Sequence, residues 1–120
     1  MRKRLILIAP FLAAALLLTA NLASCYTNSI ERHFVSYYNH GTVTASGEPF
    51  VKTNFTCAVR EYDDMGHWYV FTYQNRSVYC WANDVMPRSS NAEYDLSEGA
   101  FAKLAPLKAG MVRMHVREVQ

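Results

Sequence analysis

Several signatures of well-known enzyme classes are missing from this sequence. It contains no HExxH zinc motif, no CxxC pair, no GxSxG nucleophile turn and no glycine-rich phosphate loop. Its four histidines are spaced too irregularly for a local metal site, so we expect neither a metal nor a cofactor. With only 5 Gly and 4 Pro in 120 residues, the chain is neither collagen-like nor of low complexity.

The sequence also lacks a surplus of cations beyond its first few residues. The formal net charge is +2, but Arg2, Lys3 and Arg4 are three of the 12 basic residues, and the other nine face 10 acidic ones. This balance disfavours nucleic acid as a partner. Apolar residues, by contrast, are plentiful at 51%, which excludes a disordered chain and allows one compact domain at this length.

The N-terminal segment has the order of an export signal. The basic residues precede an apolar run over residues 5–20, and small and polar residues follow. A transmembrane anchor is the alternative, although the run contains Pro10 and is shorter than the roughly 20 residues that a span requires.

The segment Leu22-Ala23-Ser24-Cys25, which follows the apolar run, resembles a bacterial lipobox. It predicts a lipoprotein signal peptide over residues 1–24 and a lipid on Cys25, which would hold the protein at a membrane surface. An ordinary cleavage that leaves Cys25 as a spare thiol is the alternative. Because Tyr26 follows the cysteine rather than Asp, the expected location is the bacterial outer membrane, facing the periplasm.

The cysteine count fits this interpretation. Three cysteines in an exported chain leave one unpaired. If Cys25 is acylated, Cys57 and Cys80 remain together in an oxidising compartment. We expect them to form a disulfide that stabilises the domain by roughly 3 kcal/mol. Two buried free thiols are the alternative.

Short stretches rich in aromatic and β-branched residues predict a mainly β domain. The expected strands cover residues 30–38, 55–59, 68–73 and 77–82 and an alternating segment near residues 112–117. Residues 74–76 are the expected tip of a hairpin. One helix is expected to begin near Ser97, capped by Asp95 or Ser97, and to end at Pro106. Several short strands with one small helix favour a compact β-barrel.

Two carboxylates lie in irregular surroundings. Glu48 stands between Gly47 and Pro49, and Asp84 lies between a predicted strand and a proline-containing loop. Carboxylates at strand ends, with aromatic side chains nearby, suit the cleavage of a glycosidic bond. Capping of backbone N–H groups in turns is the alternative for each of them.

Longer motifs resemble a known family. The segments Ser36-Tyr37-Tyr38 and 40–50, which includes TASGEPF, resemble the opening of the RlpA-like double-psi β-barrel family. Similar stretches follow at residues 76–78, 83–87, 94–104 and 110–119. The resemblance implies a six-stranded double-psi β-barrel with one or two short helices over residues 35–120, after a tether over residues 25–34.

The family acts on bacterial peptidoglycan, and the resemblance implies a lytic transglycosylase. Such an enzyme cleaves the bond between N-acetylmuramic acid and N-acetylglucosamine and leaves a 1,6-anhydro end. The family's acidic pair falls on Asp84, as acid and then base, and on Glu48, which would orient Asp84 or stabilise the transition state. The expected substrate-binding residues are Tyr38, Ser46, Trp81 and Asn83.

The sequence departs from the family pattern near these residues. Val59 stands where the family usually has a histidine, and Val85-Met86 replace an Arg-Gly pair beside Asp84. These changes favour an alternative, a non-catalytic envelope lipoprotein that binds glycan strands through aromatic side chains. The candidate aromatics are Trp68, Tyr73 and Trp81. An interaction subunit of an envelope or phage system is a further alternative.

Overall fold

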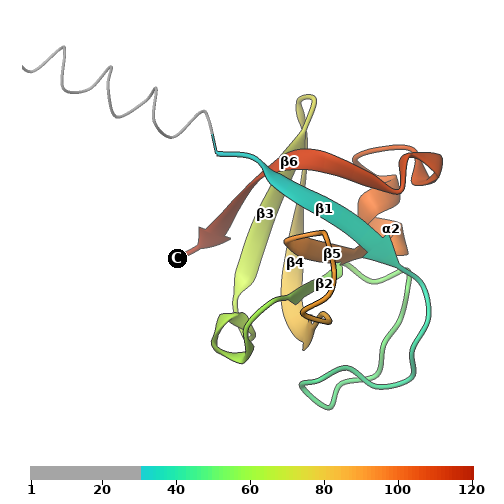
Figure 1. Ribbon diagram of the computed structural model, residues 1–120, viewed down its shortest axis with the longest axis vertical. Coiled ribbons are helices and arrows are strands. Elements are labelled where there is room, and N and C mark those ends of the chain that lie inside the picture. The colour runs from blue at the N-terminus through green and yellow to red at the C-terminus, as the bar shows by residue number, and fades with distance from the viewer. Residues whose placement is uncertain (1–30) are drawn as a thin grey trace, which may run out of the picture. The chain divides into compact units, whose positions relative to one another are not determined.

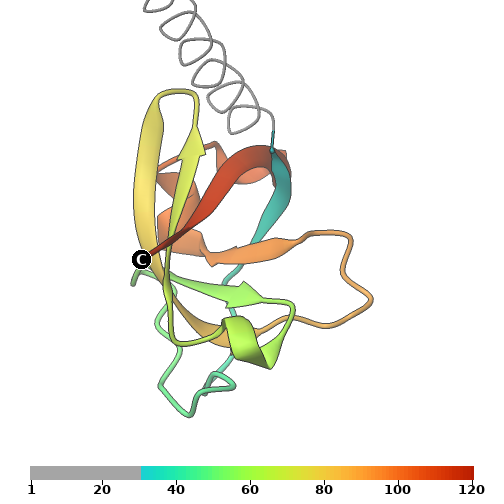
Figure 2. The ribbon, with the colours of Figure 1, turned by 90° about the vertical axis from the view of Figure 1, so that its left-hand side faces the viewer.

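The computed structural model describes residues 31–120, which form a closed six-stranded β-barrel (Figure 1). The strands are β1 (His33–Tyr38), β2 (Thr56–Val59), β3 (Trp68–Tyr73), β4 (Arg76–Val85), β5 (Tyr94–Ser97) and β6 (Met111–Val119). Around the barrel they follow the order β1-β5-β2-β4-β3-β6 (Figure 2). The short helices are η1 (Tyr62–Asp64), α2 (Glu98–Ala102) and η2 (Leu107–Ala109). The predicted fold class is confirmed.

The predicted signal peptide over residues 1–24 and the acylation site Cys25 lie outside the described residues. The structure begins within the segment expected as a tether, residues 25–34, and β1 already starts at His33. Between residues 31 and 120, no helix has the length and apolar character needed to cross a bilayer.

The β3–β4 hairpin confirms the predicted turn. Its tip residues Gln74 and Asn75 have φ angles of 45° and 67°. Two consecutive residues in the left-handed region match the twist of the flanking strands, and asparagine tolerates this conformation better than most residues. Strand β4 then continues to Val85, three residues beyond the predicted end, and carries Asp84 within the sheet.

The barrel interior is filled by apolar side chains from strands and from α2. The largest fully buried hydrophobic side chains are Phe71, Leu96, Phe101, Leu104 and Met114. Each stabilises the fold by about 1.5–3 kcal/mol through burial. The loop over residues 39–55 is attached to α2 at Gly99, whose N–H donates to the Lys52 carbonyl at 2.8 Å. A Cβ at Gly99 would lie 3.0 Å from the Thr53 backbone, so a side chain does not fit there.

The sequence analysis missed one strand. Residues 94–97 were expected to lead into the helix, but they form β5, which pairs in parallel with β1 and antiparallel with β2. Ser97 is the N-cap residue of α2, but its side chain makes no capping hydrogen bond; its hydroxyl donates to the Asn54 carbonyl instead. Asp95 lies within β5 and therefore does not cap α2.

The predicted disulfide is wrong, because Cys57 and Cys80 are free, buried thiols. Cys57 lies opposite Ala82 on the parallel strand β4, and Cys80 lies two residues earlier on that strand. Two residues of rise and one strand spacing displace their Cα atoms by about 8 Å. Disulfides require Cα atoms about 4.4–6.8 Å apart. Burial raises the pKa of Cys80 to about 12 and that of Cys57 well above its usual range, so both thiols keep their protons.

Candidate active site

A tight turn presents the predicted residues Ser46 and Glu48. The Thr44 N–H donates to the Glu48 carbonyl at 2.8 Å, and the Gly47 N–H donates to the Thr44 carbonyl at 2.9 Å. Gly47 has a φ of 89°, a conformation that glycine adopts without strain. Thr44 is buried beneath the turn, so the turn is packed against the barrel rather than free in solvent.

A β-bulge on β4 directs Asp84 outward. In the β2–β4 ladder Cys57 faces Ala82 and Ala58 faces Asp84, so Asn83 is an extra residue on β4. A bulge of this kind re-aims the side chain that follows it. The Asn83 carbonyl accepts a hydrogen bond from the Ser46 N–H at 3.1 Å. Asn83 therefore holds the turn against β4.

Asp84 accepts hydrogen bonds from three parts of the fold. Its Oδ2 accepts from the Tyr38 hydroxyl at 3.0 Å, at the end of β1. Its Oδ1 accepts from the backbone N–H groups of Ala45 and Val85, both at 2.9 Å. Tyr38 is itself fixed by stacking on Phe50, with ring centroids 4.5 Å apart. The Asp84 carboxylate is thus held in one orientation by β1, the turn and β4.

Asp84 lines a cavity of about 310 Å³ on the outer surface of the barrel. The other lining residues are Tyr38, His40, Ala58, Val85, Met86, Pro87 and Asp95. Ala58, Met86 and Ala92 form a small apolar cluster with Tyr38 next to it. The cavity therefore combines an apolar base with two carboxyl groups and a histidine, a set of groups that suits proton transfer.

The second carboxyl group, Asp95, was not among the predicted site residues. Parallel pairing with β1 places it beside Ser36, whose hydroxyl donates to Oδ1 at 2.9 Å. Burial raises the pKa of Asp95, and the charge of Asp84 raises it further. The hydrogen bond from Ser36 opposes this rise. The alternation of Tyr94 and Leu96 with Asp95 and Ser97 was a strand signal that could have revealed it.

Tyr38 is a stable hydrogen-bond donor to Asp84. Burial first, and then the Asp84 charge, raise the pKa of the Tyr38 hydroxyl above its usual range. The hydroxyl therefore keeps its proton at neutral pH and can donate to the carboxylate. The structure thus brings together Tyr38, predicted as a substrate-binding residue, and Asp84, predicted as a catalytic one.

Glu48 belongs to a neighbouring group rather than to the cavity lining. Its Oε1 accepts hydrogen bonds from the Ser46 hydroxyl and from the Trp81 indole N–H, both at 3.2 Å. The predicted residues therefore form two groups, Tyr38 with Asp84 and Glu48 with Ser46 and Trp81. The Ser46 contact to the Asn83 backbone connects these groups. The Asn83 side chain is buried, and its Oδ1 has no hydrogen-bond partner.

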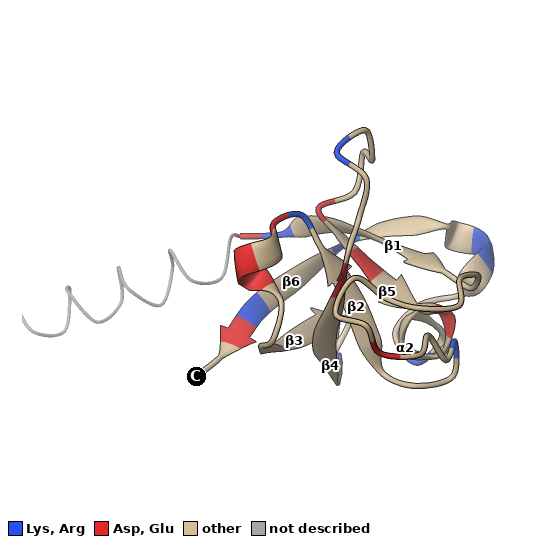
Figure 3. Cartoon of the chain, turned by 90° about the horizontal axis from the view of Figure 1, so that it is seen from below, with Lys and Arg blue, Asp and Glu red and all other residues tan. Residues whose placement is uncertain are grey.

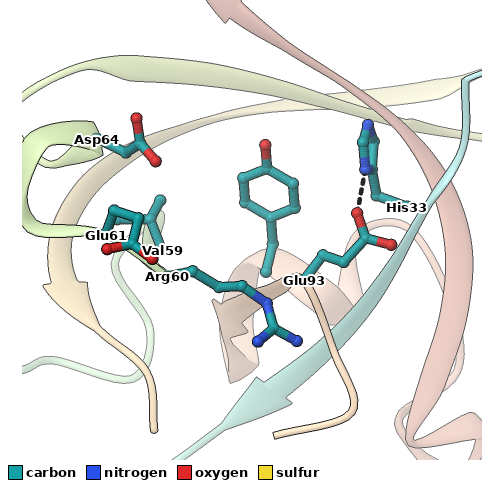
Figure 4. A pocket seen from close by; sticks show the side chains of 7 residues that line it. His33, Val59, Arg60, Glu61, Asp64 and Glu93 are labelled. Carbon is teal, nitrogen blue, oxygen red and sulfur yellow. Dashed lines mark hydrogen bonds and ion pairs between the residues drawn. The ribbon is translucent and has the colours of Figure 1, made fainter. Parts of the chain in front are cut away.

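Val59, at the position of the family histidine, faces a different cavity. This second cavity has a volume of about 280 Å³ and is shown in Figure 4. It is lined by His33, Val59, Arg60, Glu61, Asp64, Glu93 and Tyr94. Val59 is almost fully buried, whereas its neighbour Ala58 lines the cavity that holds Asp84. The valine thus changes the barrel interior and not the lining around Asp84.

The second cavity contains a paired carboxylate. The His33 Nδ1 and the Glu93 carboxylate are hydrogen-bonded, and the Arg60 guanidinium donates to the Ser90 and Ala92 carbonyls at 2.9 and 2.6 Å. The hydrogen bond with His33 lowers the pKa of Glu93, although burial opposes this effect. Within residues 31–120 no cluster of His, Cys, Asp and Glu could hold a metal ion.

Charge is spread over the surface of the barrel. Figure 3 shows Lys and Arg on several separate loops and strands rather than on one face. Within residues 31–120 this distribution forms no extended basic stripe. It agrees with the near balance of charges beyond the first residues of the sequence.

Comparisons with known proteins fit this architecture. Residues 31–116 match the family model described as lytic transglycolase. No curated protein matches the chain. Among solved structures, the Streptomyces papain inhibitor has a TM-score of 0.66 and 24% identity, over 75% of this chain and 94% of the inhibitor.

Expansin from Clavibacter michiganensis is also similar. The apo form has a TM-score of 0.62 and 19% identity, over 74% of this chain and 50% of the expansin. A point mutant in complex with cellohexaose has a TM-score of 0.62 and 17% identity, with the same coverage. The chain thus spans half of the expansin, and likeness at these identities shows the barrel fold alone.

Proposed function

The chain belongs to the lytic transglycolase family of double-psi β-barrels, and on this basis we propose that it cleaves peptidoglycan glycan strands. The proposed bond joins N-acetylmuramic acid to N-acetylglucosamine, and the proposed product has a 1,6-anhydro end. The observation that carries the proposal is the pair of carboxyl groups, Asp84 and Asp95, in one cavity.

The two carboxyl groups differ in a way that suits an acid and a base. Asp95 is largely buried and accepts a hydrogen bond from Ser36, and its raised pKa favours the protonated form. Asp84 accepts three hydrogen bonds, which hold its carboxylate in one orientation at the cavity, where we assign it the role of proton acceptor. Unequal environments of two carboxyl groups are the usual basis of an acid and base pair.

The proposed reaction balances without water. The Asp95 proton passes to the glycosidic oxygen as the bond from that oxygen to C1 of the muramic acid breaks. The C6 hydroxyl of the same sugar then bonds to C1, and its proton passes to Asp84. A proton returns from Asp84 to Asp95 before the next cycle. In this scheme Asp95 is the acid and Asp84 is the base, whereas the sequence analysis assigned both roles to Asp84.

For Glu48 the contacts suggest a role beside the cavity that differs from the predicted one of orienting Asp84 or stabilising the transition state. Glu48 holds the indole of Trp81 through a hydrogen bond and is itself held by Ser46. We propose that it contacts the sugar next to the cleaved bond and positions Trp81. Tyr38 and Asn83 then act as positioning residues, the first through Asp84 and the second through the turn.

The test is product analysis on glycan strands freed of stem peptides. Full-length protein, purified in detergent, should release fragments with anhydro ends that mass spectrometry detects. The Asp84→Asn and Asp95→Asn variants should lose the product, while the exposed control Asp63→Asn should keep it. A wild-type protein that releases no anhydro ends contradicts the enzymatic proposal.

A non-catalytic glycan-binding protein is the second candidate. Two observations favour it: Val59 replaces the family histidine, and an expansin of the same fold was solved with cellohexaose. A protein of this kind should sediment with sacculi and leave them uncleaved. Sedimentation without product therefore selects the second candidate over the first.

We also propose that the protein is a lipoprotein of the bacterial envelope, anchored in the outer membrane. The support is the lipobox-like segment that ends at Cys25. A Cys25→Ser variant should fail to incorporate labelled fatty acid and should accumulate as a larger precursor. Normal processing of this variant would contradict the anchor and leave the proposed activity untouched.

A further inference from the structure

Both tryptophans of the chain lie side by side on the outside of the barrel. Trp68 on β3 is paired directly with Trp81 on β4, and their ring centroids are 5.4 Å apart at an interplanar angle of 53°. In the next row Val70 faces Tyr79. Trp68 is 47% exposed and Tyr79 is 54% exposed. We call Trp68, Tyr79 and Trp81 the tryptophan face.

Strand β6 adds a cation to this surface. Its residue Arg117 is paired with Val70, and the next outward residue, Val119, is paired with Trp68. Arg117 is exposed, and within residues 31–120 it forms no ion pair with a carboxylate. The tryptophan face thus joins exposed aromatic rings to a cation that is available to an outside anion.

The tryptophan face is continuous with the candidate active site. Trp81 precedes Asp84 by three residues on β4, which is about 10 Å along an extended strand. The indole N–H of Trp81 donates to Glu48, on the turn that also supplies an N–H to Asp84. A polymer that occupies the cavity and continues along β4 therefore meets the tryptophan face next.

We propose that the tryptophan face is a distal subsite for an anionic glycan strand, with one sugar ring stacked on an indole and a muramic lactyl carboxylate beside Arg117. This inference rests on the proposed function. Pyranose rings present a flat C–H surface that aromatic rings cover well, and exposed aromatic clusters mark interaction sites. The lactyl carboxylate matches the unpaired guanidinium and distinguishes this strand from a neutral glucan.

The barrel carries a matched control on the other side of β6. Phe34 on β1 is 42% exposed, and the Arg113 guanidinium lies 5.3 Å from its ring centroid. Arg113 and Arg117 project from the same strand, but Arg113 is paired with Phe34 and not with the β3–β4 surface. Phe34→Ala and Arg113→Gln therefore remove an aromatic ring and an arginine charge, as the test variants do, but away from the tryptophan face.

The experiment measures the binding of full-length protein, in detergent, to two ligands, peptide-free glycan strands and neutral cellohexaose. Trp68→Ala should weaken binding of the glycan strands about tenfold, and Trp68→Phe should retain most of it. Arg117→Gln should weaken binding of the glycan strands only and reduce its dependence on salt. Both control variants should bind as the wild type does.

The outcomes separate this inference from the proposed function. If the wild type binds the strands and Trp68→Ala binds equally well, the subsite is wrong whatever the enzyme does. If the wild type binds but releases no anhydro ends, the enzymatic proposal fails and the subsite stands. If Trp68→Ala changes only the sedimentation coefficient of the protein, the face pairs with a second copy, which overturns the subsite. If the wild type binds no strand, both proposals fail.

Discussion

The two cavities of the barrel have similar volumes, about 310 and 280 Å³, yet the pKa of a carboxyl group is raised in one and lowered in the other. In the first, burial raises the pKa of Asp95, and Asp84 adds to the effect. In the second, the hydrogen bond with His33 lowers the pKa of Glu93. A carboxyl group alone therefore does not identify a proton donor; the balance between burial and hydrogen bonding around it does.

The largest expected difference between the two cavities is in catalysis. Asp95→Asn should reduce release of anhydro ends by about 100-fold or more, because it removes a general acid. Glu93→Gln should leave the rate close to that of the wild type. In the wild type, the rate should fall as pH rises through the pKa of Asp95, since the donor then loses its proton. Product counts across a pH series check this, and a large loss in Glu93→Gln would contradict it.

The next expected effect concerns the wall that the two cavities share. Arg60 donates to the carbonyls of Ser90 and Ala92, in the loop that also carries Pro87 of the first cavity. Arg60→Ala should lower the free energy of unfolding by about 1.5–3 kcal/mol, because charge-assisted hydrogen bonds are lost. Urea unfolding measures this change. Arg88→Ala, in the same loop, is the control and should change little.

A smaller effect should appear in the pH dependence of stability, with opposite signs in the two cavities. Glu93 has a lowered folded-state pKa, so its contribution is present above its unfolded pKa and is lost as pH falls through the folded value. Asp95 has a raised folded-state pKa, so its contribution is present below its unfolded pKa and is lost as pH rises through the folded value.

Thermal unfolding of two variants tests these signs. At neutral pH Glu93→Gln should be less stable than the wild type by about 0.5 kcal/mol, a small amount because 40% of its side chain is exposed. Asp95→Asn should be more stable at neutral pH by at most about 1 kcal/mol. Both differences should shrink in acid. Changes of the same sign would contradict the contrast between the cavities.

The smallest expected effect is that of a reductant. Cys57 on strand β2 is a free thiol buried in the hydrophobic core. Dithiothreitol should therefore leave the melting temperature unchanged, and a thiol reagent should react only after unfolding. Lower stability in reductant would show that a disulfide forms between Cys57 and Cys80.

Much of the barrel could be predicted from local patterns. The β3–β4 hairpin follows from its aromatic strands and from Asn75, and β6 follows from its alternation around Met114. The turn that presents Glu48 follows from its glycine and proline. These features depend on residues close in the sequence, where propensity and side-chain period decide the structure.

What could not be predicted depends on pairing between distant strands. Asp95 joins Asp84 because β5 lies between β1 and β2, and the short segment that forms β5 also resembles the start of a helix. The cysteines do not bond because, in the register of β2 with β4, Cys80 lies two residues before the partner of Cys57. Asp84 faces the cavity because of a bulge at Asn83, which only the register reveals.

The closure of the barrel limits how any partner can be held. In the ring that residues 31–120 form, each of the six strands pairs with a strand on either side along part of its length. Strand addition, a common way to recognise peptides through their backbone, therefore has only short one-sided stretches to use, such as residues 76–80 of β4. Recognition then depends mainly on side chains on the outer surface and on the loops. A polymer without peptide groups suits such a surface, and closure of the ring also limits edge-to-edge aggregation of the folded protein.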